Sequence, residues 1–256
     1  IEQNMTLIEA TILGIVQGFT EFLPISSSGH LVLGQAILGI EQPGNEFEIL
    51  VHLGTLASVL VVFFEDIKSL LMSINSKKTQ TFILFILIGT LPAVGVGLGL
   101  KDFLDSLFDN INAVGSALIF TGIVLYSSSF AKRQNKEHTF ITSILIGCAQ
   151  AIAIIPGISR SGMTISAGLF LGLSPKEAAR FSFLLAIPAI GGAGLLTALD
   201  VSGGFQMPIS VAIAGISSSF VVGVVALKWL LGWLEQGKFH YFGIYCLVVG
   251  ALTILA

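Results

Sequence analysis

The stretch QGFTEFLPISSSGH, residues 17–30, interrupts an apolar run and decides the fold class of the chain. Two apolar segments, residues 7–23 and 31–40, lie on either side of its Pro24–His30 part. A helix needs about 20 residues to cross a bilayer, so the second piece is too short to cross alone. A short apolar segment directly after a break of Pro, Ser and Gly predicts a re-entrant hairpin or a discontinuous helix.

The composition points to lipid as the solvent of the folded chain. Hydrophobic residue types make up 54% of the 256 residues and charged types only 11%. A soluble domain carries roughly 25% charged residues, so this chain has too few charges to cover a surface in water. We therefore expect a multi-pass integral membrane protein that forms one membrane domain over residues 1–256. The net charge of −3 gives no basic excess, so nucleic acid is not an expected partner.

An internal repeat organises this domain. A shift of 133 residues superposes the polar and glycine positions of two segments, namely Gly14/Gly147, Gln17/Gln150, Ile25/Ile158, Ser26/Ser159, Ser28/Ser161 and Gly29/Gly162. Closer to the end of each half, a shift of 128 places Gly115 on Gly243 and Gly122 on Gly250. We predict an all-α fold of two inverted-topology repeats, residues 1–135 and 136–256. It would hold about six transmembrane helices plus two re-entrant helical hairpins.

The first break carries ionisable and hydroxyl side chains. Gln17 and Glu21 are four residues apart and share a helix face, and Ser27 and His30 are three apart at the start of the next helix. A charged group within a membrane segment costs about 2.5–3.5 kcal/mol on insertion scales, so such residues are candidates for function. Three structural readings stay open, which are an interfacial position for Glu21, a core role for His30 and helix capping by Ser26, Ser27 and Ser28.

The second break, PGISRSGMT over residues 156–164, carries one charge. Arg160 is the only charged residue between Glu137 and Lys176, and its planar guanidinium suits phosphate oxygens. The hydroxyl groups nearby and the amide groups of a glycine-containing helix start would add donors to the same anion. A structural salt bridge to Glu21 is the alternative, and it would also bring the two breaks together.

The two breaks differ in chemistry. The repeat places Ile154 at the position of Glu21 and Arg160 at the position of Ser27. We therefore expect one composite site in which the first half supplies chemistry and the second half holds an anion. Elsewhere, His52 is interpreted as a helix-packing residue, with a second base as the alternative, and Glu48 lies either at a segment edge or in the cavity.

Together the two motifs resemble a known family. Gln17-x-x-x-Glu21 with Pro24-Ile-Ser-Ser-Ser-Gly-His30, and Pro156-Gly-Ile-Ser-Arg-Ser-Gly-Met-Thr164, are similar to the signatures of the bacitracin-resistance type undecaprenyl-pyrophosphate phosphatases. The similarity extends over nearly the whole chain. That family has Glu or Gln at the position of Gln17. Because Gln17 cannot act as a base, any acidic role must belong to Glu21.

The resemblance implies an activity and a location. A member of this family removes the terminal phosphate of the C55 isoprenyl diphosphate and leaves the monophosphate carrier lipid used for cell-wall synthesis. The resemblance further implies a bacterial plasma membrane, an active site open to its outer side, and a divalent cation such as Mg²⁺ or Ca²⁺. Glu21 and Gln17 would be the metal ligands. A homodimer is also expected.

Our hypothesis for the mechanism gives each predicted site residue a role. Ser27 is the preferred nucleophile with His30 as its base, while Glu21 orients His30 or binds the cation. Arg160 stabilises charge on the phosphoryl group. The predicted phosphate-binding residues are Ser26, Ser28, Gly29, Gly157, Ser159, Ser161 and Thr164. Attack by water or by His30 itself stays open.

A second function is consistent with the same pattern. Inverted repeats with broken helices that meet at the membrane centre are typical of transporters, so a lipid carrier flippase is the alternative to a phosphatase.

Overall fold

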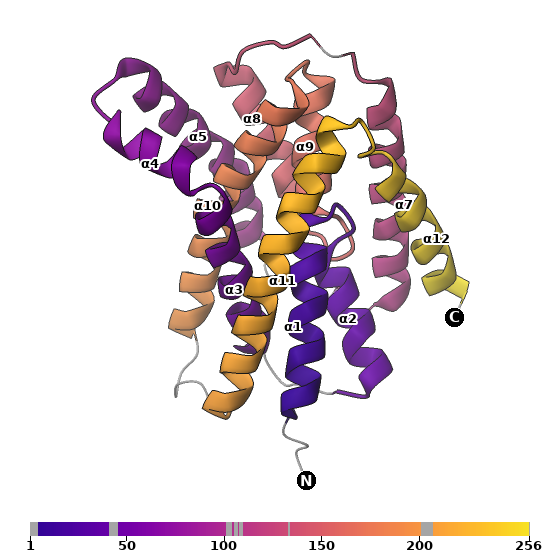
Figure 1. Cartoon of the computed structure of the whole chain (residues 1–256). Coiled ribbons are helices and arrows are strands. Elements are labelled where there is room, and N and C mark those ends of the chain that lie inside the picture. Colours follow the sequence, from indigo (N-terminus) through magenta and orange to yellow (C-terminus); the bar gives the residue numbers. More distant parts are fainter. Residues whose placement is uncertain are drawn as a thin grey trace.

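The computed structural model is helical throughout the part of the chain that it describes, residues 5–40, 46–100, 104, 107, 110–132, 134–200 and 207–255. The first half contains α1 (Leu7–Phe22), α2 (Ser27–Leu38), α3 (Glu46–Val62), α4 (Phe64–Met72), α5 (Lys77–Gly99) and α7 (Ile111–Ser127), followed by a 3₁₀ turn, η1 (Ser128–Phe130). The second half contains α8 (Phe140–Ile152), α9 (Arg160–Phe170), α10 (Pro175–Asp200), α11 (Ile209–Glu235) and α12 (Tyr241–Leu255). Figure 1 shows these helices as one bundle.

Equivalent caps begin the first helix of each half. The Thr6 hydroxyl accepts a hydrogen bond from the Glu9 amide and the Glu9 side chain accepts one from the Thr6 amide, which is a capping box. Thr139 and Thr142 form the same arrangement at the start of α8. The two positions differ by 133 residues, so the repeat includes the helix start signal.

The helix lengths revise the expected number of crossings. Among the described residues, four helices are long and apolar enough to cross a membrane, namely α5, α7 with η1, α10 and α11. A fifth crossing is formed if α3 and α4, which meet at a bend of 67°, are counted as one broken span. Helices α8 and α12 are apolar but shorter. The helical membrane fold is therefore confirmed, whereas the count of six is not.

Two helical hairpins enter the bundle from opposite ends. Helices α1 and α2 lie in the lower half of Figure 1, and α8 and α9 lie in the upper half. Each hairpin turns at the predicted break, over residues 23–26 and 153–159. The two turns meet inside the bundle, because a Cβ atom added to Gly29 would lie 3.3 Å from the Cα of Gly157, and one added to Gly162 would lie 3.3 Å from the Cβ of Pro24.

Glycine contacts set the closest helix crossings. A Cβ atom on Gly14 of α1 would lie 2.7 Å from the carbonyl oxygen of Gly215 on α11. A Cβ atom on Gly147 of α8 would clash in the same way with the carbonyl oxygen of Gly89 on α5. Because neither glycine has a side chain, each hairpin can pack closely against a long helix of the other half.

Helices α7 and α12 also cross at glycines. Gly115 opposes Gly250, and Gly122 opposes Gly243, with a Cβ on Gly122 placed 2.8 Å from the carbonyl oxygen of Gly243. The sequence repeat pairs these four glycines the other way, Gly115 with Gly243 and Gly122 with Gly250. An operation that exchanges the two halves therefore converts one contact into the other.

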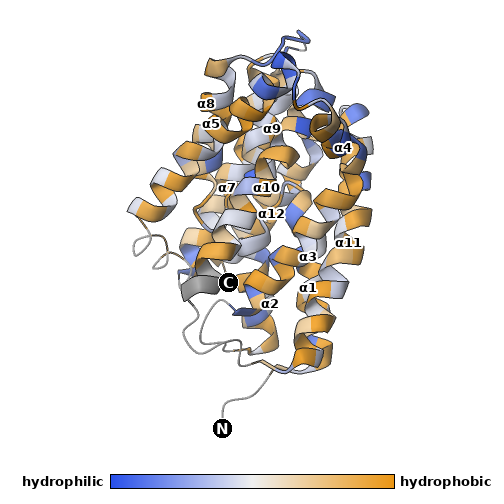
Figure 2. Ribbon diagram, turned by 90° about the vertical axis from the view of Figure 1, so that its left-hand side faces the viewer, coloured by the Kyte–Doolittle hydropathy of each residue, from blue (hydrophilic) through white to orange (hydrophobic). Residues whose placement is uncertain are grey.

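The outer surface is apolar along most of the bundle. Figure 2 shows hydrophobic residues over most of the ribbon and hydrophilic residues gathered at the upper end near α4. Exposed Leu, Ile, Val and Phe side chains occur on all the long helices, as lipid contact requires.

Side-chain contacts hold several elements together at the polar end of the bundle, the end near α4. Arg180 Nε donates to Asp66 Oδ1 at 2.7 Å, and the ring of His138 lies 4.5 Å from that of Phe181 and 6.0 Å from that of Phe82. The pKa of His138, in the linker between the halves, lies below its ordinary value because burial of the ring disfavours the charged form. These contacts tie α4, α5, the linker and α10 together at one end of the bundle.

Substitution of Gly147 by alanine tests the crossing of α5 and α8. The added methyl group has to push α8 away from the backbone of Gly89, so Gly147→Ala should lower the stability by about 1–3 kcal/mol. Gly232→Ala in α11 is the matched control, since nothing lies within 4 Å of its added Cβ and alanine is the better helix former. Thermal unfolding in detergent measures both. Equal melting temperatures for the two variants would show that the crossing is looser than described.

Candidate active site

An ion pair joins the turns of the two hairpins. Arg160 Nη2 at the start of α9 donates to Glu21 Oε1 near the end of α1 at 2.9 Å. The side chains are 15% and 5% exposed, so both charges are shielded from solvent. The salt bridge that the sequence left as an alternative is therefore present, and it connects the two halves of the repeat.

The other oxygen of Glu21 organises the first hairpin. Ser27 Oγ donates to Glu21 Oε2 at 2.7 Å, and Gln17 Nε2 donates to the same oxygen at 3.1 Å. Gln17 and Glu21 share a face of α1 as predicted, and the turn at Pro24 brings Ser27 back toward that face. The serine hydroxyl thus lies against a carboxylate that can receive its proton.

Serine caps hold both turns. Ser26 precedes α2 with a positive φ of 68°, and its hydroxyl accepts from the amide of Gly29 at 3.3 Å. Ser159 precedes α9, and its hydroxyl accepts from the amide of Gly162 at 3.1 Å. The capping interpretation is confirmed for Ser26, and Ser159 caps in the same way. Ser27 follows the cap and is therefore free to reach Glu21.

His30 lies in a different place from the one predicted. Its Nδ1 is 2.8 Å from the carbonyl oxygen of Ser26, and its Nε2 is 2.8 Å from the hydroxyl of Tyr245 on α12. Both ring nitrogens are engaged, so neither is available to Ser27. The hypothesis of a Ser27–His30 pair therefore disagrees with the geometry. The ring instead holds the strained backbone at Ser26 and links α2 to α12.

His52 is the imidazole that lies beside Glu21, although the sequence analysis favoured a packing role for it. Its Nε2 on α3 lies 3.6 Å from Glu21 Oε2, and its Nδ1 lies 2.6 Å from the carbonyl oxygen of Glu48. Because Nδ1–H donates to that carbonyl, Nε2 is the ring nitrogen that faces the carboxylate of Glu21. The packing interpretation of His52 is corrected. The available signal was the pair Glu48 and His52, two polar residues four apart on one face of an apolar helix.

A cavity of about 670 Å³ opens from this cluster. Its polar lining comes from the hairpins, α3, α5 and α8, and includes Thr20, Glu21, Ser27, Ser28, Glu48, His52, Thr90, Gln150, Ser159 and Arg160. Its apolar lining comes mainly from Ala93–Leu98 of α5 and 188–196 of α10. The cavity therefore has a polar end for a charged group and apolar walls that lead away from it.

The predicted phosphate-binding residues divide into two groups. Ser28 and Ser159 line the cavity. The others support the turns, as the fully buried Thr164 shows by its hydroxyl contacts with the Arg160 carbonyl at 2.8 Å and the Ser182 hydroxyl at 2.6 Å. The residues outside the cavity lining are Ser26, Gly29, Gly157, Ser161 and Thr164.

Comparison with known proteins identifies the family. Residues 10–252 match the family described as bacitracin resistance protein BacA. The chain belongs to the BacA family. A relative from Desulforapulum autotrophicum, named undecaprenyl-diphosphatase, is 41% identical over 98% of this chain and 99% of its own length. Relatives of the same name are 43% identical in Korarchaeum cryptofilum, over 96% and 97%, and 40% identical in Halothermothrix orenii, over 98% and 98%.

A metal ion on Glu21 and Gln17 of this BacA-family chain would compete with protein hydrogen bonds to Glu21. Among the described residues, no group of three His, Cys, Asp or Glu side chains is placed to bind a metal. Glu21 accepts hydrogen bonds on both oxygens, and Gln17 turns its amide nitrogen, a donor, toward it. Both oxygens of Glu21 are thus taken by protein donors, whereas Gln17 Oε1 is buried without a hydrogen-bond partner among the described residues.

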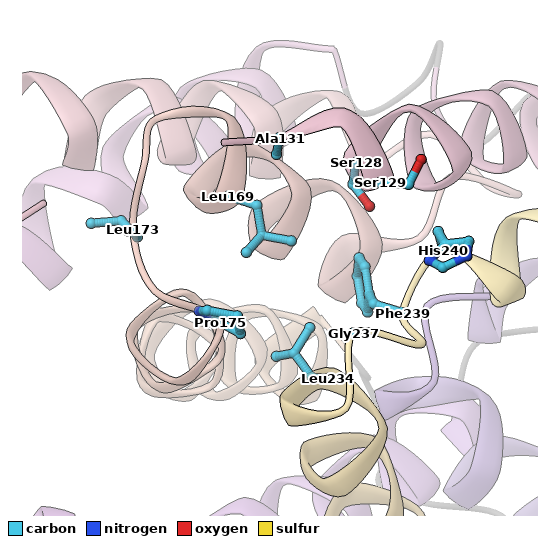
Figure 3. Close-up of a pocket in the computed structure, with 10 residues that line it drawn as sticks. All are labelled: Ser128, Ser129, Ala131, Leu169, Leu173, Pro175, Leu234, Gly237, Phe239 and His240. Carbon is cyan, nitrogen blue, oxygen red and sulfur yellow. The ribbon is translucent and has the colours of Figure 1, made fainter. Parts of the chain in front are cut away.

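A second cavity of the BacA-family chain has a different character. It measures about 120 Å³ and lies between the loops that follow α7, α9 and α11 (Figure 3). Its described lining holds two serines and His240 among apolar residues such as Leu169, Leu234 and Phe239.

Removal of Arg160 tests the ion pair independently of activity. Arg160→Met leaves the carboxylate of Glu21 buried without its partner and should lower the stability by about 3–5 kcal/mol. The double variant Arg160→Met/Glu21→Gln should recover a large part of this loss, because neither charge is then left alone. The measurement is thermal unfolding in detergent.

The pair of Arg180 and Asp66 at the polar end supplies the control. Its side chains are 26% and 38% exposed, so Asp66→Asn should cost no more than about 1 kcal/mol. Strictly additive effects of the two substitutions at Arg160 and Glu21 would contradict the direct pairing.

Proposed function

We propose that this chain hydrolyses undecaprenyl diphosphate to undecaprenyl monophosphate and inorganic phosphate. The observation that carries the proposal is the cluster of Ser27, Glu21 and Arg160, which places a nucleophile, a carboxylate and a guanidinium at one end of a cavity with apolar walls. The names of the relatives, at about 40% identity over nearly the full length, support the same substrate.

The cavity suits a lipid diphosphate in both charge and shape. Arg160 offers an anion a fixed guanidinium, and the N-termini of α2 and α9 add partial positive charge at the same turns. The apolar lining from α5 and α10 offers a surface for an isoprenoid chain. A soluble diphosphate would gain nothing from those walls.

In the proposed reaction, Ser27 Oγ forms a bond to the terminal phosphorus. The bond from this phosphorus to the bridging oxygen breaks, and the lipid monophosphate leaves with that electron pair. The proton of Ser27 moves to Glu21, with which the hydroxyl already shares a hydrogen bond of 2.7 Å. Water then attacks the phosphoserine, releases inorganic phosphate and restores the hydroxyl. Arg160 stabilises the negative charge in both steps.

The two histidines have separate roles in this proposal. His52 lies 3.6 Å from Glu21 and shares the proton that Glu21 receives. His30 positions the backbone before Ser27 through the carbonyl of Ser26.

We also propose that Mg²⁺ or Ca²⁺ enters with the diphosphate as its counter-ion and is not a resident metal. Magnesium commonly binds through substrate phosphates and one or two carboxylates. Glu48, four residues before His52, lines the cavity and is the carboxylate that would bind such a cation in this proposal. Phosphate release with and without EDTA tests the requirement, and full activity in EDTA would remove the cation from the proposal.

We propose that the cavity opens on the outer side of a plasma membrane. Among the described residues, the basic side chains in the connections and at the nearby helix starts lie at the polar end, and they are Lys77, Lys78, Lys132, Lys136, Lys176 and Lys238. Such loops favour the cytoplasm. The cavity extends toward the opposite end, since its lining includes Leu98 and Leu196, close to the ends of α5 and α10. Labelling of single cysteines introduced in the basic loops, by a reagent that cannot cross the membrane, tests this orientation.

The two halves are proposed to be inverted repeats. In support, α1 packs on α11 as α8 packs on α5, and α7 packs on α12. The hairpins enter from opposite ends (Figure 1).

A homodimer is a further proposal, supported by Gly95 and Gly99 of α5, which are four residues apart and have open space around them. Cross-linking between copies that carry a cysteine at this face of α5 tests it.

Ser27→Ala and Glu21→Gln should each lower phosphate release from undecaprenyl diphosphate by about 100-fold or more, because one lacks the nucleophile and the other the base. The assay uses purified protein whose melting temperature shows that it is folded. A phospho-adduct on Ser27 that accumulates at low temperature would be direct support. Near wild-type rates in Ser27→Ala would instead assign the attack to water.

In proteoliposomes, phosphate release without lipid translocation separates this function from the flippase alternative, which the relatives' names do not favour.

His52→Leu should lower kcat by about tenfold, because Glu21 loses the neighbour that shares its proton. His52→Gln keeps a polar group beside Glu21, but its amide cannot take up a proton, so it should lose about as much activity as His52→Leu. The rate constants of these two variants, measured beside wild type at one pH, decide the role of the ring. Equal loss in both variants would mean that only an imidazole serves, and no loss in either would remove His52 from the proton transfer.

A further inference from the structure

The side chain of Gln150 in α8 is buried without a protein partner. The residue is 2% exposed, and both its amide nitrogen and its amide oxygen have no hydrogen-bond partner in the part of the chain that the structure describes. It belongs to the lining of the large cavity. A buried amide without partners is costly, so such a group calls for a ligand.

The repeat shows why Gln150 differs from its counterpart. Gln17 occupies the equivalent position in α1, and its amide nitrogen donates to Glu21 one turn later. One turn after Gln150 stands Ile154, which has no acceptor in its side chain. The glutamine of the first half therefore donates to a protein carboxylate, whereas the glutamine of the second half has its amide available to a group bound in the cavity.

Arg160 provides a second unpartnered donor at this cavity. Its Nη2 is committed to Glu21, whereas its buried Nη1 has no hydrogen-bond partner among the described residues. The amide nitrogen of Gln150 and this Nη1 carry two N–H bonds each and together present four. Negatively charged phosphoryl oxygens are the acceptors that match such donors.

The position of Gln150 indicates which phosphate it meets. The terminal phosphorus has to reach Ser27, on the α2 side of the cavity. The lipid tail leaves along the apolar wall that contains Ala93 and Val94. Helix α8 packs on α5, which carries that wall, at the crossing of Gly147 and Gly89, one turn before Gln150 and Ala93. The amide therefore lies where the polar end of the cavity meets the path of the tail.

We propose that Gln150, with Nη1 of Arg160, binds the phosphate that stays on the lipid. Gln150 is then a specificity residue for the substrate's second phosphate and for the monophosphate product. This inference rests on the proposed function, since it assumes a lipid diphosphate in the cavity.

The test compares Gln150→Leu with wild type and with Ser166→Ala. Ser166 of α9 is buried and its hydroxyl is also without a partner, but it does not line the cavity, so it controls for the loss of a buried polar group. Gln150→Leu should raise the KM for undecaprenyl diphosphate about tenfold, equal to about 1.4 kcal/mol of binding, with a smaller change in kcat. The inhibition constant of undecaprenyl monophosphate should rise by the same factor. Ser166→Ala should leave both constants unchanged.

Two outcomes would overturn the inference. A higher KM with an unchanged inhibition constant for the monophosphate would place Gln150 on the transferred phosphate. A lower melting temperature with both constants unchanged would make Gln150 a purely structural residue.

A binding measurement separates this inference from the proposed function. Inorganic pyrophosphate should raise the melting temperature of wild type and of Ser166→Ala, and it should raise that of Gln150→Leu much less. If wild type releases no phosphate from undecaprenyl diphosphate, the proposed function fails while this comparison still tests Gln150 as a phosphate ligand. If wild type is active and the three proteins respond equally to pyrophosphate, the role of Gln150 fails alone.

Discussion

A carboxylate and a guanidinium buried inside an apolar bundle constrain the rest of this structure. Neither Glu21 nor Arg160 could be left alone in such surroundings without a cost of several kcal/mol, so the two hairpins that carry them have to meet. The contact lies between residues 139 positions apart in the chain, one from each half of the repeat. The ion pair thus fixes the turn of α1 and α2 against the turn of α8 and α9.

Glycine makes that meeting geometrically feasible. The hairpins can reach the centre only if their helices pack closely against α11 and α5, and Gly14 and Gly147 permit this approach. The same principle holds α7 against α12 at two glycine pairs. Close packing through small residues is the main source of cohesion available in lipid, where burial of apolar surface gives no net driving force. The repeated glycines and the Glu21–Arg160 ion pair therefore act together, since the glycines bring the turns close and the ion pair defines how they face.

The site arises because the two halves have diverged at equivalent positions. Glu21 corresponds to Ile154, Ser27 corresponds to Arg160, and Gln17 corresponds to Gln150 with a different set of partners. A symmetric pair of breaks would place like groups opposite one another, whereas this pair places a carboxylate and a hydroxyl opposite a guanidinium. The backbone turns and serine caps stay alike in both halves, since Ser26 and Ser159 satisfy the same helix ends. The backbone turns and caps are thus repeated in the two halves, whereas the side chains of the site differ between them.

The sequence by itself determined the solvent, the helical class, the two breaks and the convergence of Glu21, Ser27 and Arg160. These features follow from local properties of the sequence: the low content of charged residues, the helix breaks at Pro and Gly, and the cost of an unpaired charge in lipid. Only the tertiary structure decided the orientation of the imidazoles. A spacing of three residues places Ser27 and His30 on one face, but the ring of His30 turns to Ser26 and to Tyr245, 215 residues away, while His52 approaches Glu21 from α3. Helix packing sets such directions, and sequence spacing within one segment carries no information about a partner on another helix.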